Sequence, residues 1–144
     1  MVKYLLDSCI IISALRGDTD IQKKINCVGI QNCGISELVL AELYAGPYKL
    51  MQTSTDERSR HRARLQIESL HLLEEKFEIL PWQGCSEEYA REHVRLASLG
   101  QGIEDIDLMI GAYASRNGYI MVTGNARHFE RIERLRIENW YKGQ

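Results

Sequence analysis

The stretch that decides the fold is Lys3-Tyr4-Leu5-Leu6-Asp7-Ser8-Cys9-Ile10-Ile11-Ile12. Its first five residues predict a buried strand that ends on a carboxylate, and the apolar run after Ser8 predicts a buried helix near residues 8 to 15. A strand that leads directly into a buried helix is typical of an α/β domain with a mainly parallel sheet. Ligands bind outside the carboxyl ends of the strands in such sheets. Asp7 is therefore a candidate site residue.

Two further carboxylates lie in segments that otherwise belong to a core. Glu42 follows Leu38 by four residues in the helical segment 37–43, so its side chain shares an apolar face. Asp107 opens the segment 107–114 and shares its face with small residues such as Gly111, which predict the close approach of another element. Buried carboxylates usually hold a cation or form an ion pair.

Three unpaired carboxylates in one cleft would repel each other and raise their own pKa values unless a cation lay among them. Mg²⁺ prefers such oxygen ligands, and a bound metal can activate water for phosphodiester hydrolysis. Each acid also has a structural alternative. Asp7 could cap the following helix, Glu42 could pair with a core arginine, and Asp107 could be favoured by the helix dipole.

Composition limits the class of protein. The chain has 144 residues, of which 44% are hydrophobic and 26% charged, so we expect one domain over 1–144 with a sizeable core. Its net charge of −2 excludes a polycation that coats nucleic acid by charge alone. The first 15 residues resemble neither a signal peptide nor a membrane span. Four cysteines without a CxxC pair, with Cys9 expected as a small buried hydrophobe, predict a reduced cytoplasmic protein.

Strand-like and helix-like segments alternate along the rest of the chain. Helices are expected at 20–27, from a cap at Ser36 to a stop near Gly46-Pro47, at 55–75 with one apolar stripe that includes Leu65 and Leu72, at 86–99, and from a cap at Asp105 to Gly118. Further strands are expected to end at 34–35 and to span 77–80, 119–122 and 135–139, with a turn at 123–125.

In this order, the segments resemble the PIN domain family, and more narrowly its VapC-type members, the toxin ribonucleases of bacterial toxin–antitoxin pairs. The resemblance rests on Leu6-Asp7-Ser8, the helix 36–43, Ile103 to Ala112, Val122 to Phe129 and the end at 135–140. It implies an α/β/α sandwich and Mg²⁺- or Mn²⁺-dependent endonucleolytic cleavage of RNA by a metal-activated water.

The resemblance also implies roles for single residues. Asp7, Glu42 and Asp107 match the catalytic, metal-binding acids of the family. Asn125 matches a fourth position that is often aspartate, and His128 stands where an acid is common, so the number of metals stays open. Supporting polar roles fall to Ser8 and Thr123, which could equally be cap or turn formers, and to Asp105, whose simpler interpretation is the helix cap.

Arginines supply the only local basic surfaces. One run holds Arg60, Arg62 and Arg64, and a second begins at Arg127; arginine forks match phosphate oxygens, which makes both candidate RNA contacts. Acidic residues interleave with both runs, so a solvated helix face is the alternative. A metal-free scheme would need paired histidines. The four histidines of this chain show no paired spacing.

The expected partners are RNA, a cognate antitoxin and a second copy of the chain, with no membrane and with DNA reached only through the antitoxin. We expect the antitoxin to place an arginine or lysine among the acids and so block hydrolysis. The main alternative to an endoribonuclease toxin is a PIN-like RNA-binding or scaffold module that does not cleave, which the neutral Asn125 favours; another phosphohydrolase, such as a DNA nuclease, is a third class.

Overall fold

Five parallel strands in the order β3-β2-β1-β4-β5 form the centre of the protein in a computed structural model that describes residues 1–141. Tyr4 at the start of β1 pairs with Cys33 of β2 on one side and with Ile120 of β4 on the other. The strands are β1 (Tyr4–Leu6), β2 (Cys33–Ser36), β3 (Glu78–Leu80), β4 (Ile120–Val122) and β5 (Arg136–Glu138). The predicted parallel sheet is confirmed.

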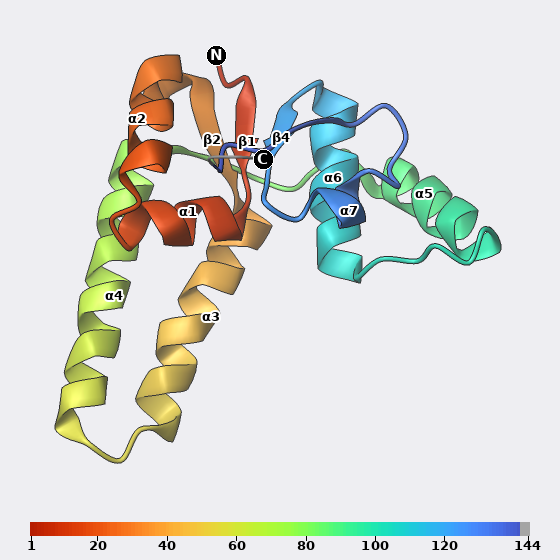
Figure 1. Ribbon diagram of the computed structural model, residues 1–144. Helices are drawn as coiled ribbons and strands as arrows, with labels where there is room; N and C mark the ends of the chain where they lie inside the picture. The colour runs from red at the N-terminus through yellow and green to blue at the C-terminus, as the bar shows by residue number, and fades with distance from the viewer. Residues whose placement is uncertain (142–144) are drawn as a thin grey trace.

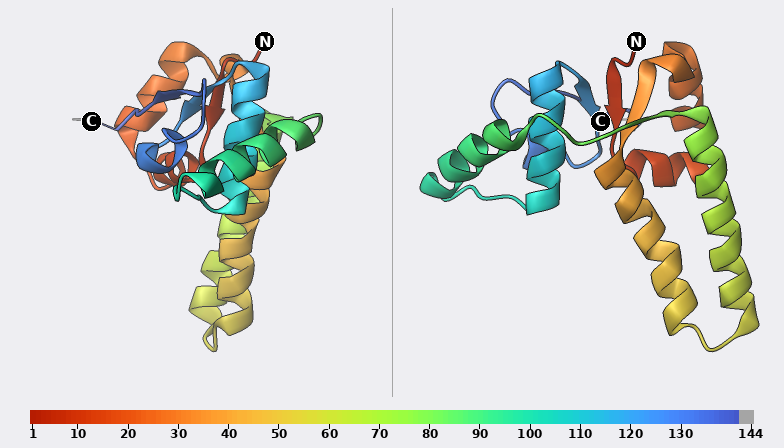
Figure 2. Two further views of the ribbon diagram at one scale, coloured as in Figure 1. Left: turned by 90° about the vertical axis from the view of Figure 1, so that its right-hand side faces the viewer. Right: turned by 180° about the vertical axis from the view of Figure 1, so that it is seen from behind.

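Helices cover both faces of the sheet, so that the α/β/α prediction is also confirmed. Figure 2 shows α1 and α2 on one side of the strands and α5 and α6 on the other. The helical segments are α1 (Ser8–Leu15), α2 (Thr19–Val28), the short 3-10 turn η1 (Ile30–Asn32), α3 (Glu37–Thr53), α4 (Glu57–Lys76), α5 (Ser86–Ser98), α6 (Asp105–Asn117) and α7 (Ala126–Phe129). Sequence reasoning missed only the two short ones, η1 and α7.

The inner strands are buried on both faces, as their apolar sequences require. Leu5 and Leu6 of β1, Ile35 of β2 and Met121 of β4 are inaccessible to solvent. Gly34 allows close packing of β2 against β3, because a Cβ atom there would lie 2.8 Å from Leu80 Cδ1. Among residues 1–141, no helix is both long enough and apolar enough to cross a bilayer.

The predicted stop at Gly46-Pro47 is wrong, because α3 continues to Thr53 with Pro47 inside it. Proline removes a helical N–H and crowds the preceding turn, which costs about 3 kcal/mol in an isolated helix. Here both Leu43 and Pro47 are buried, and α4 packs along the helix on its way back. Tertiary packing therefore offsets the local cost of proline, whereas a prediction from the sequence pattern takes only that local cost into account.

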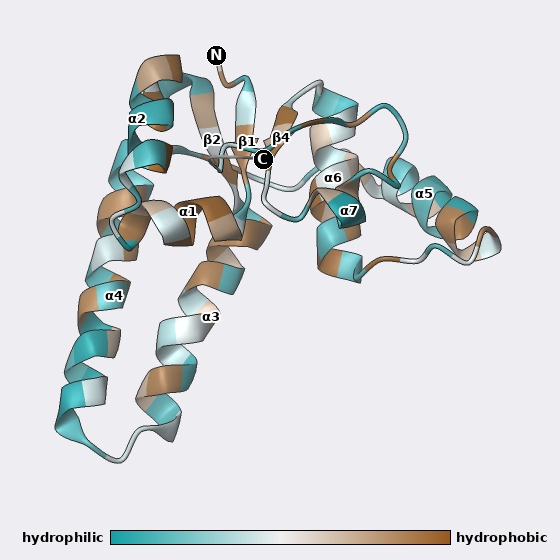
Figure 3. Cartoon of the chain, viewed as in Figure 1, coloured by the Kyte–Doolittle hydropathy of each residue, from teal (hydrophilic) through white to brown (hydrophobic). Residues whose placement is uncertain are grey.

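Together, α3 and α4 form a long antiparallel hairpin that projects away from the sheet (Figure 1). Its inner side is apolar, since Ala63, Ile67 and Leu70 of α4 are buried. Leu65 and Leu72 were expected in the same apolar stripe but lie at 49% and 55% exposure, because they face away from α3. Figure 3 shows that hydrophilic residues dominate the half of α4 near the tip of the hairpin.

Candidate active site

Three different elements bring the predicted acids to the carboxyl edge of the sheet. Asp7 follows β1 directly, Glu42 lies in the second turn of α3, which starts where β2 ends, and Asp107 lies in the first turn of α6. Asp7 is only 6% exposed, and the other two are half-buried. Parallel strands end at the same edge, and this shared edge gathers residues that are far apart in the sequence.

Asp7 is held by donors on both carboxylate oxygens. The Ser8 backbone N–H donates to Oδ1 at 2.9 Å, and the buried Thr123 hydroxyl donates to Oδ2 at 2.7 Å. Asp7 is thus also the N-cap of α1, as the structural alternative proposed. Its own N–H donates to Val122 O at 2.9 Å, which ties the end of β1 to β4. Both of these donors are neutral, and no basic side chain among residues 1–141 forms an ion pair with Asp7.

Burial and mutual repulsion raise the pKa values of two acids. Burial raises the pKa of Asp7, with a further increase from the Asp107 charge and opposing hydrogen bonds from Thr123 and Ser8. Burial also raises the pKa of Glu42, and the charges of Asp107, Asp7 and Glu104 add to it, whereas hydrogen bonding to the Ser8 side chain lowers it. The three acids therefore share one electrostatic environment.

Glu42 forms no ion pair with any of residues 1–141, so the alternative of a core arginine is wrong within that range. Hydrogen bonding to the Ser8 side chain lowers the pKa of Glu42, as expected for a supporting polar group beside this acid. Glu104, the N-cap residue of α6, adds to the negative field at Glu42. Its only sequence signal is its position beside the start of α6.

A chain of polar contacts links Asp7 to Asp107 through the turn after β4. Thr123 Oγ1, which donates to Asp7, accepts a hydrogen bond from the Asn125 backbone N–H at 2.9 Å. Asn125 Nδ2 lies 2.9 Å from His128 Nδ1, and the same ring nitrogen lies 3.3 Å from Asp107 Oδ2. Thr123, Asn125 and His128 thus all belong to the site.

Cys9 is not the buried hydrophobe that the sequence predicted. It is half-buried, and its Sγ accepts a hydrogen bond from the Gly124 N–H at 3.3 Å and lies 3.8 Å from Asp7 Oδ2. The first turn of α1 faces the 123–125 turn, and the apolar sequence of residues 9–12 does not predict which element this turn will face. All four cysteines of the described range are free thiols.

Asp105 is not the cap of α6, since Glu104 takes that position and Asp105 is the first helical residue. Its Oδ1 accepts a hydrogen bond from the Tyr89 hydroxyl at 3.0 Å and lies 3.9 Å from His93 Nδ1. The side chain is therefore engaged with α5. Within residues 1–141, Asp105 forms no hydrogen bond with any of the three acids.

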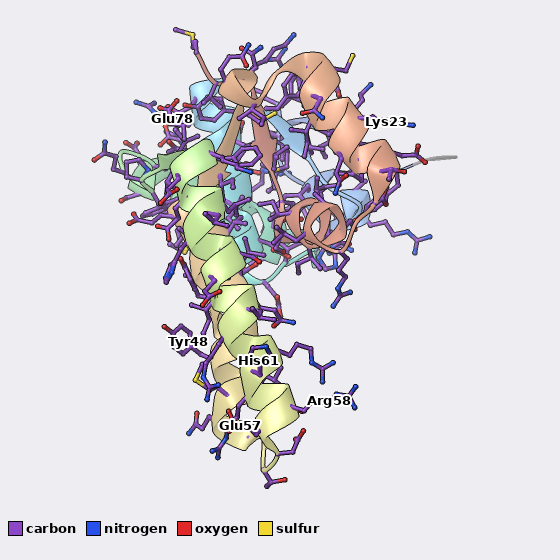
Figure 4. The ribbon with its side chains drawn as sticks, turned by 90° about the vertical axis from the view of Figure 1, so that its left-hand side faces the viewer. Lys23, Tyr48, Glu57, Arg58, His61 and Glu78 are labelled. Atoms are coloured by element: carbon purple, nitrogen blue, oxygen red, sulfur yellow. The ribbon has the colours of Figure 1, made fainter. Side chains whose placement is uncertain are left out.

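The candidate RNA-binding arginines fall into two places. Arg60, Arg62 and Arg64 are exposed on the projecting hairpin, where Figure 4 shows the labelled neighbours Arg58 and His61 near its tip. Arg64 pairs with Glu57 at 2.9 Å. Arg127 is exposed on α7, next to His128, and has neither a hydrogen bond nor an ion pair among residues 1–141.

No group of three or more His, Cys, Asp or Glu side chains within residues 1–141 is already arranged to enclose a metal ion. A magnesium-type ion does not need such a cage, because it is usually held by one or two carboxylates together with waters and phosphate oxygens. The donor set fits such an ion, because the three acids offer only oxygen ligands and the charges of Asp107 and Asp7 raise the pKa of Glu42, with burial as the larger cause.

Comparison with known proteins agrees with this fold. The sequence model of the PIN domain matches residues 4–135. The chain belongs to the PIN domain family. It is 32% identical over 145 residues to ribonuclease VapC2 of Haemophilus influenzae, covering 97% of this chain and 99% of that relative. It is 29% identical over 141 residues to the tRNA(fMet)-specific endonuclease VapC of Salmonella typhimurium, covering 97% and 99%.

Solved structures support the same assignment. DNA-bound VapBC from Salmonella typhimurium superposes with a TM-score of 0.83 at 25% identity, covering 98% of this chain and 100% of that one. VapBC2 from Rickettsia felis, bound to a DNA fragment from its promoter, gives a TM-score of 0.81 at 26% identity, covering 98% and 100%. The resemblance inferred from the sequence, to VapC-type PIN domains, is confirmed.

Proposed function

We propose that this protein is an endoribonuclease toxin of a type II toxin–antitoxin pair, which hydrolyses RNA with Mg²⁺ or Mn²⁺ held by Asp7, Glu42 and Asp107. The observation that carries the proposal is the convergence of three acids, from three elements, on one edge of the sheet without an arginine or lysine partner in the described chain. The names of the similar proteins, ribonuclease and tRNA-specific endonuclease, support the substrate class.

When bound, the cation would lower the pKa of a water molecule and stabilise negative charge on the leaving oxygen. The residues of the chain prepare the site for it. The Ser8 N–H and the Thr123 hydroxyl fix the plane of the Asp7 carboxylate, so that it keeps one orientation. Burial of Asp7 lowers the local dielectric, which strengthens the attraction between its carboxylate and a cation.

RNA would be held by phosphate contacts. Arg127 supports this proposal most directly, because its guanidinium is exposed beside the site and unpaired in the described range. Arg60, Arg62 and Arg64 would contact phosphates farther from the cleaved bond, since the hairpin projects away from the sheet. Arginine forks match phosphate oxygens, and such contacts position a nucleic acid without reading its sequence.

The antitoxin partner is supported by the VapBC complexes among the similar structures. A groove between α1, α3 and α4 offers a place for one of its segments, since the apolar residues Ile12, Leu15 and Pro47 line it and Glu42 lies on its wall. An antitoxin arginine or lysine that reached Glu42 would compete with the cation. We also propose a homodimer in the cytoplasm and contact with DNA only through the antitoxin; a monomer in light scattering at micromolar concentration would contradict the dimer.

The test is cleavage of a structured total-RNA preparation by the purified chain with Mg²⁺ or Mn²⁺, and with EDTA. The variants D7N and E42Q should abolish discrete products, and so should EDTA. E37Q is the matched control, because Glu37 lies on the same helix as Glu42 but is exposed. Products that persist in EDTA and in D7N would refute the carboxylate site.

A second candidate function is an RNA-binding or scaffold module that does not cleave. The observation that favours it is Asn125, a neutral amide where the site would otherwise gain a fourth carboxylate. Electrophoretic mobility shift of the same RNA separates the two functions. A stable complex with wild-type chain and metal, without any product, would favour the binding module.

A further inference from the structure

His128 lies beside Asp107, a contact that the sequence did not predict. Its Nδ1 lies 3.3 Å from Asp107 Oδ2, and its side chain is 43% exposed while that of Asp107 is only 18% exposed. This is the one side-chain hydrogen bond of Asp107 within residues 1–141. The His128 imidazole therefore helps to orient the Asp107 carboxylate in the free protein.

Close packing of α7 against α6 creates the contact (Figure 1). Gly111 of α6 makes it possible, since a Cβ atom there would lie 2.2 Å from Ile132 Cδ1 and 3.3 Å from Phe129 Cδ1. Phe129 is fully buried and immediately follows His128. Gly111, one turn after Asp107, thus lets α7 pack close enough for His128 to contact Asp107. The small residues on this helix face predicted such a close approach.

The contact of Nδ1 with Asp107 favours the tautomer that carries the proton on Nδ1. If Nδ1 carried no proton, its lone pair would face a carboxylate oxygen of Asp107, and two acceptors repel. With the proton on Nδ1, the ring donates to Asp107 Oδ2. The Asn125 amide is then turned by 180°, so that its oxygen instead of its nitrogen lies beside Nδ1 and no other atom moves. Nε2 is then free of the proton.

We infer that His128 is a positioning residue, whose Nδ1–H, backed by Asn125, holds the Asp107 carboxylate in the orientation that receives the cation. The inference deepens the proposed function and rests on it. Through Asn125 and Thr123, the same chain of contacts ends on Asp7, so it fixes two of the three acids relative to each other. Hydrogen-bond partners of metal ligands commonly set metal affinity in this way.

The test compares amide substitutes that keep one ring nitrogen at a time. H128N places an N–H near the position of Nδ1, whereas H128Q places it near Nε2, and H128A removes both. Titration calorimetry with Mn²⁺ alone should give a dissociation constant raised about 10-fold or more for H128A and H128Q, the usual effect of losing such a partner, and within about 3-fold of wild type for H128N.

The matched control is His93, which also lies near a carboxylate, 3.9 Å from Asp105, but on α5 and away from the three acids. H93N and H93Q should bind Mn²⁺ like the wild type. The thermal midpoint of each variant, measured in EDTA, separates lost metal affinity from lost folding. Equal Mn²⁺ affinity of H128N, H128Q and wild type would overturn the inference.

A second measurement does not depend on metal or activity. The imidazole nitrogen chemical shifts of an isotope-labelled sample in EDTA report the tautomer directly, and we expect the proton on Nδ1 in wild type and no such preference in D107N. A proton on Nε2 together with an unprotonated Nδ1 in the wild type would refute the inference. If the wild type neither binds Mn²⁺ nor cleaves RNA, the proposed function fails, and the tautomer still decides what His128 does.

Discussion

Replacing Thr123 with valine should test how the site tolerates a buried carboxylate. Thr123 is inaccessible to solvent, and its hydroxyl donates to Asp7 Oδ2 at 2.7 Å while it accepts from the Asn125 N–H. Valine keeps the shape and removes the hydroxyl, so that Asp7 keeps only the Ser8 N–H and the weaker, 3.8 Å contact with the Cys9 thiol. The pKa of Asp7 should then rise further, because this hydrogen bond lowers it in the wild type.

The expected loss is that of a buried hydrogen bond to a charged group, about 1.5 to 3 kcal/mol of unfolding free energy. For a chain of 144 residues this corresponds to a thermal midpoint lower by roughly 5 to 10 °C. T123S keeps the hydroxyl and loses one methyl group, which costs about 0.8 kcal/mol. In a D7N background the acceptor is neutral, so T123V should cost only about 1 kcal/mol.

Equilibrium urea unfolding in EDTA at mildly alkaline pH measures the four variants of this cycle. The coupling free energy between Thr123 and Asp7 should be about 0.5 to 2 kcal/mol. Two results would refute the reasoning: a T123V variant as stable as T123S, or the same loss from T123V with and without D7N.

Three further predictions concern the rest of the molecule. In EDTA, unfolding free energy attributable to Asp7 and Glu42 should rise as pH falls toward their ordinary pKa values of 3.8 and 4.5, because raised folded-state pKa values let the folded chain keep protons that the unfolded chain has released. Urea unfolding across that range should therefore show a smaller gain in D7N/E42Q than in wild type, and equal slopes would contradict it. G111A should cost about 1 to 3 kcal/mol in the same assay, since its Cβ overlaps Ile132; an unchanged midpoint would show that α7 can move away freely. R127A should raise KM for RNA several-fold, more at low salt, at unchanged kcat, whereas a fall in kcat alone would mean that Arg127 does not serve RNA binding.

Local patterns predicted most of the fold because local physics produces it. The apolar run after Asp7, the cap at Ser36 and the acidic first turn of α5 all begin helices where the sequence places them. Pro47 is the exception, and its cause is not local, because α4 covers the helix that proline would otherwise end.

The site divides in the same way. Asp7, Glu42 and Asp107 stood out because a carboxylate among core residues is costly and therefore noticeable in a single segment. Glu104, Cys9 and the contacts of His128 did not stand out, since each has an ordinary interpretation in its own segment. Their roles arise only from neighbours up to 115 positions away, such as the Gly124 N–H that donates to Cys9 Sγ.

By itself, the sequence determined the alternation of strands and helices, the parallel sheet and the three acids at its edge, because hydrophobic periodicity and buried charge act within a few residues. Only the tertiary structure decided that α3 passes through Pro47, that Asp105 turns toward Tyr89, and that Asn125 and His128 join Asp7 to Asp107. Such contacts depend on the distance and direction between packed elements, which no spacing along the chain encodes.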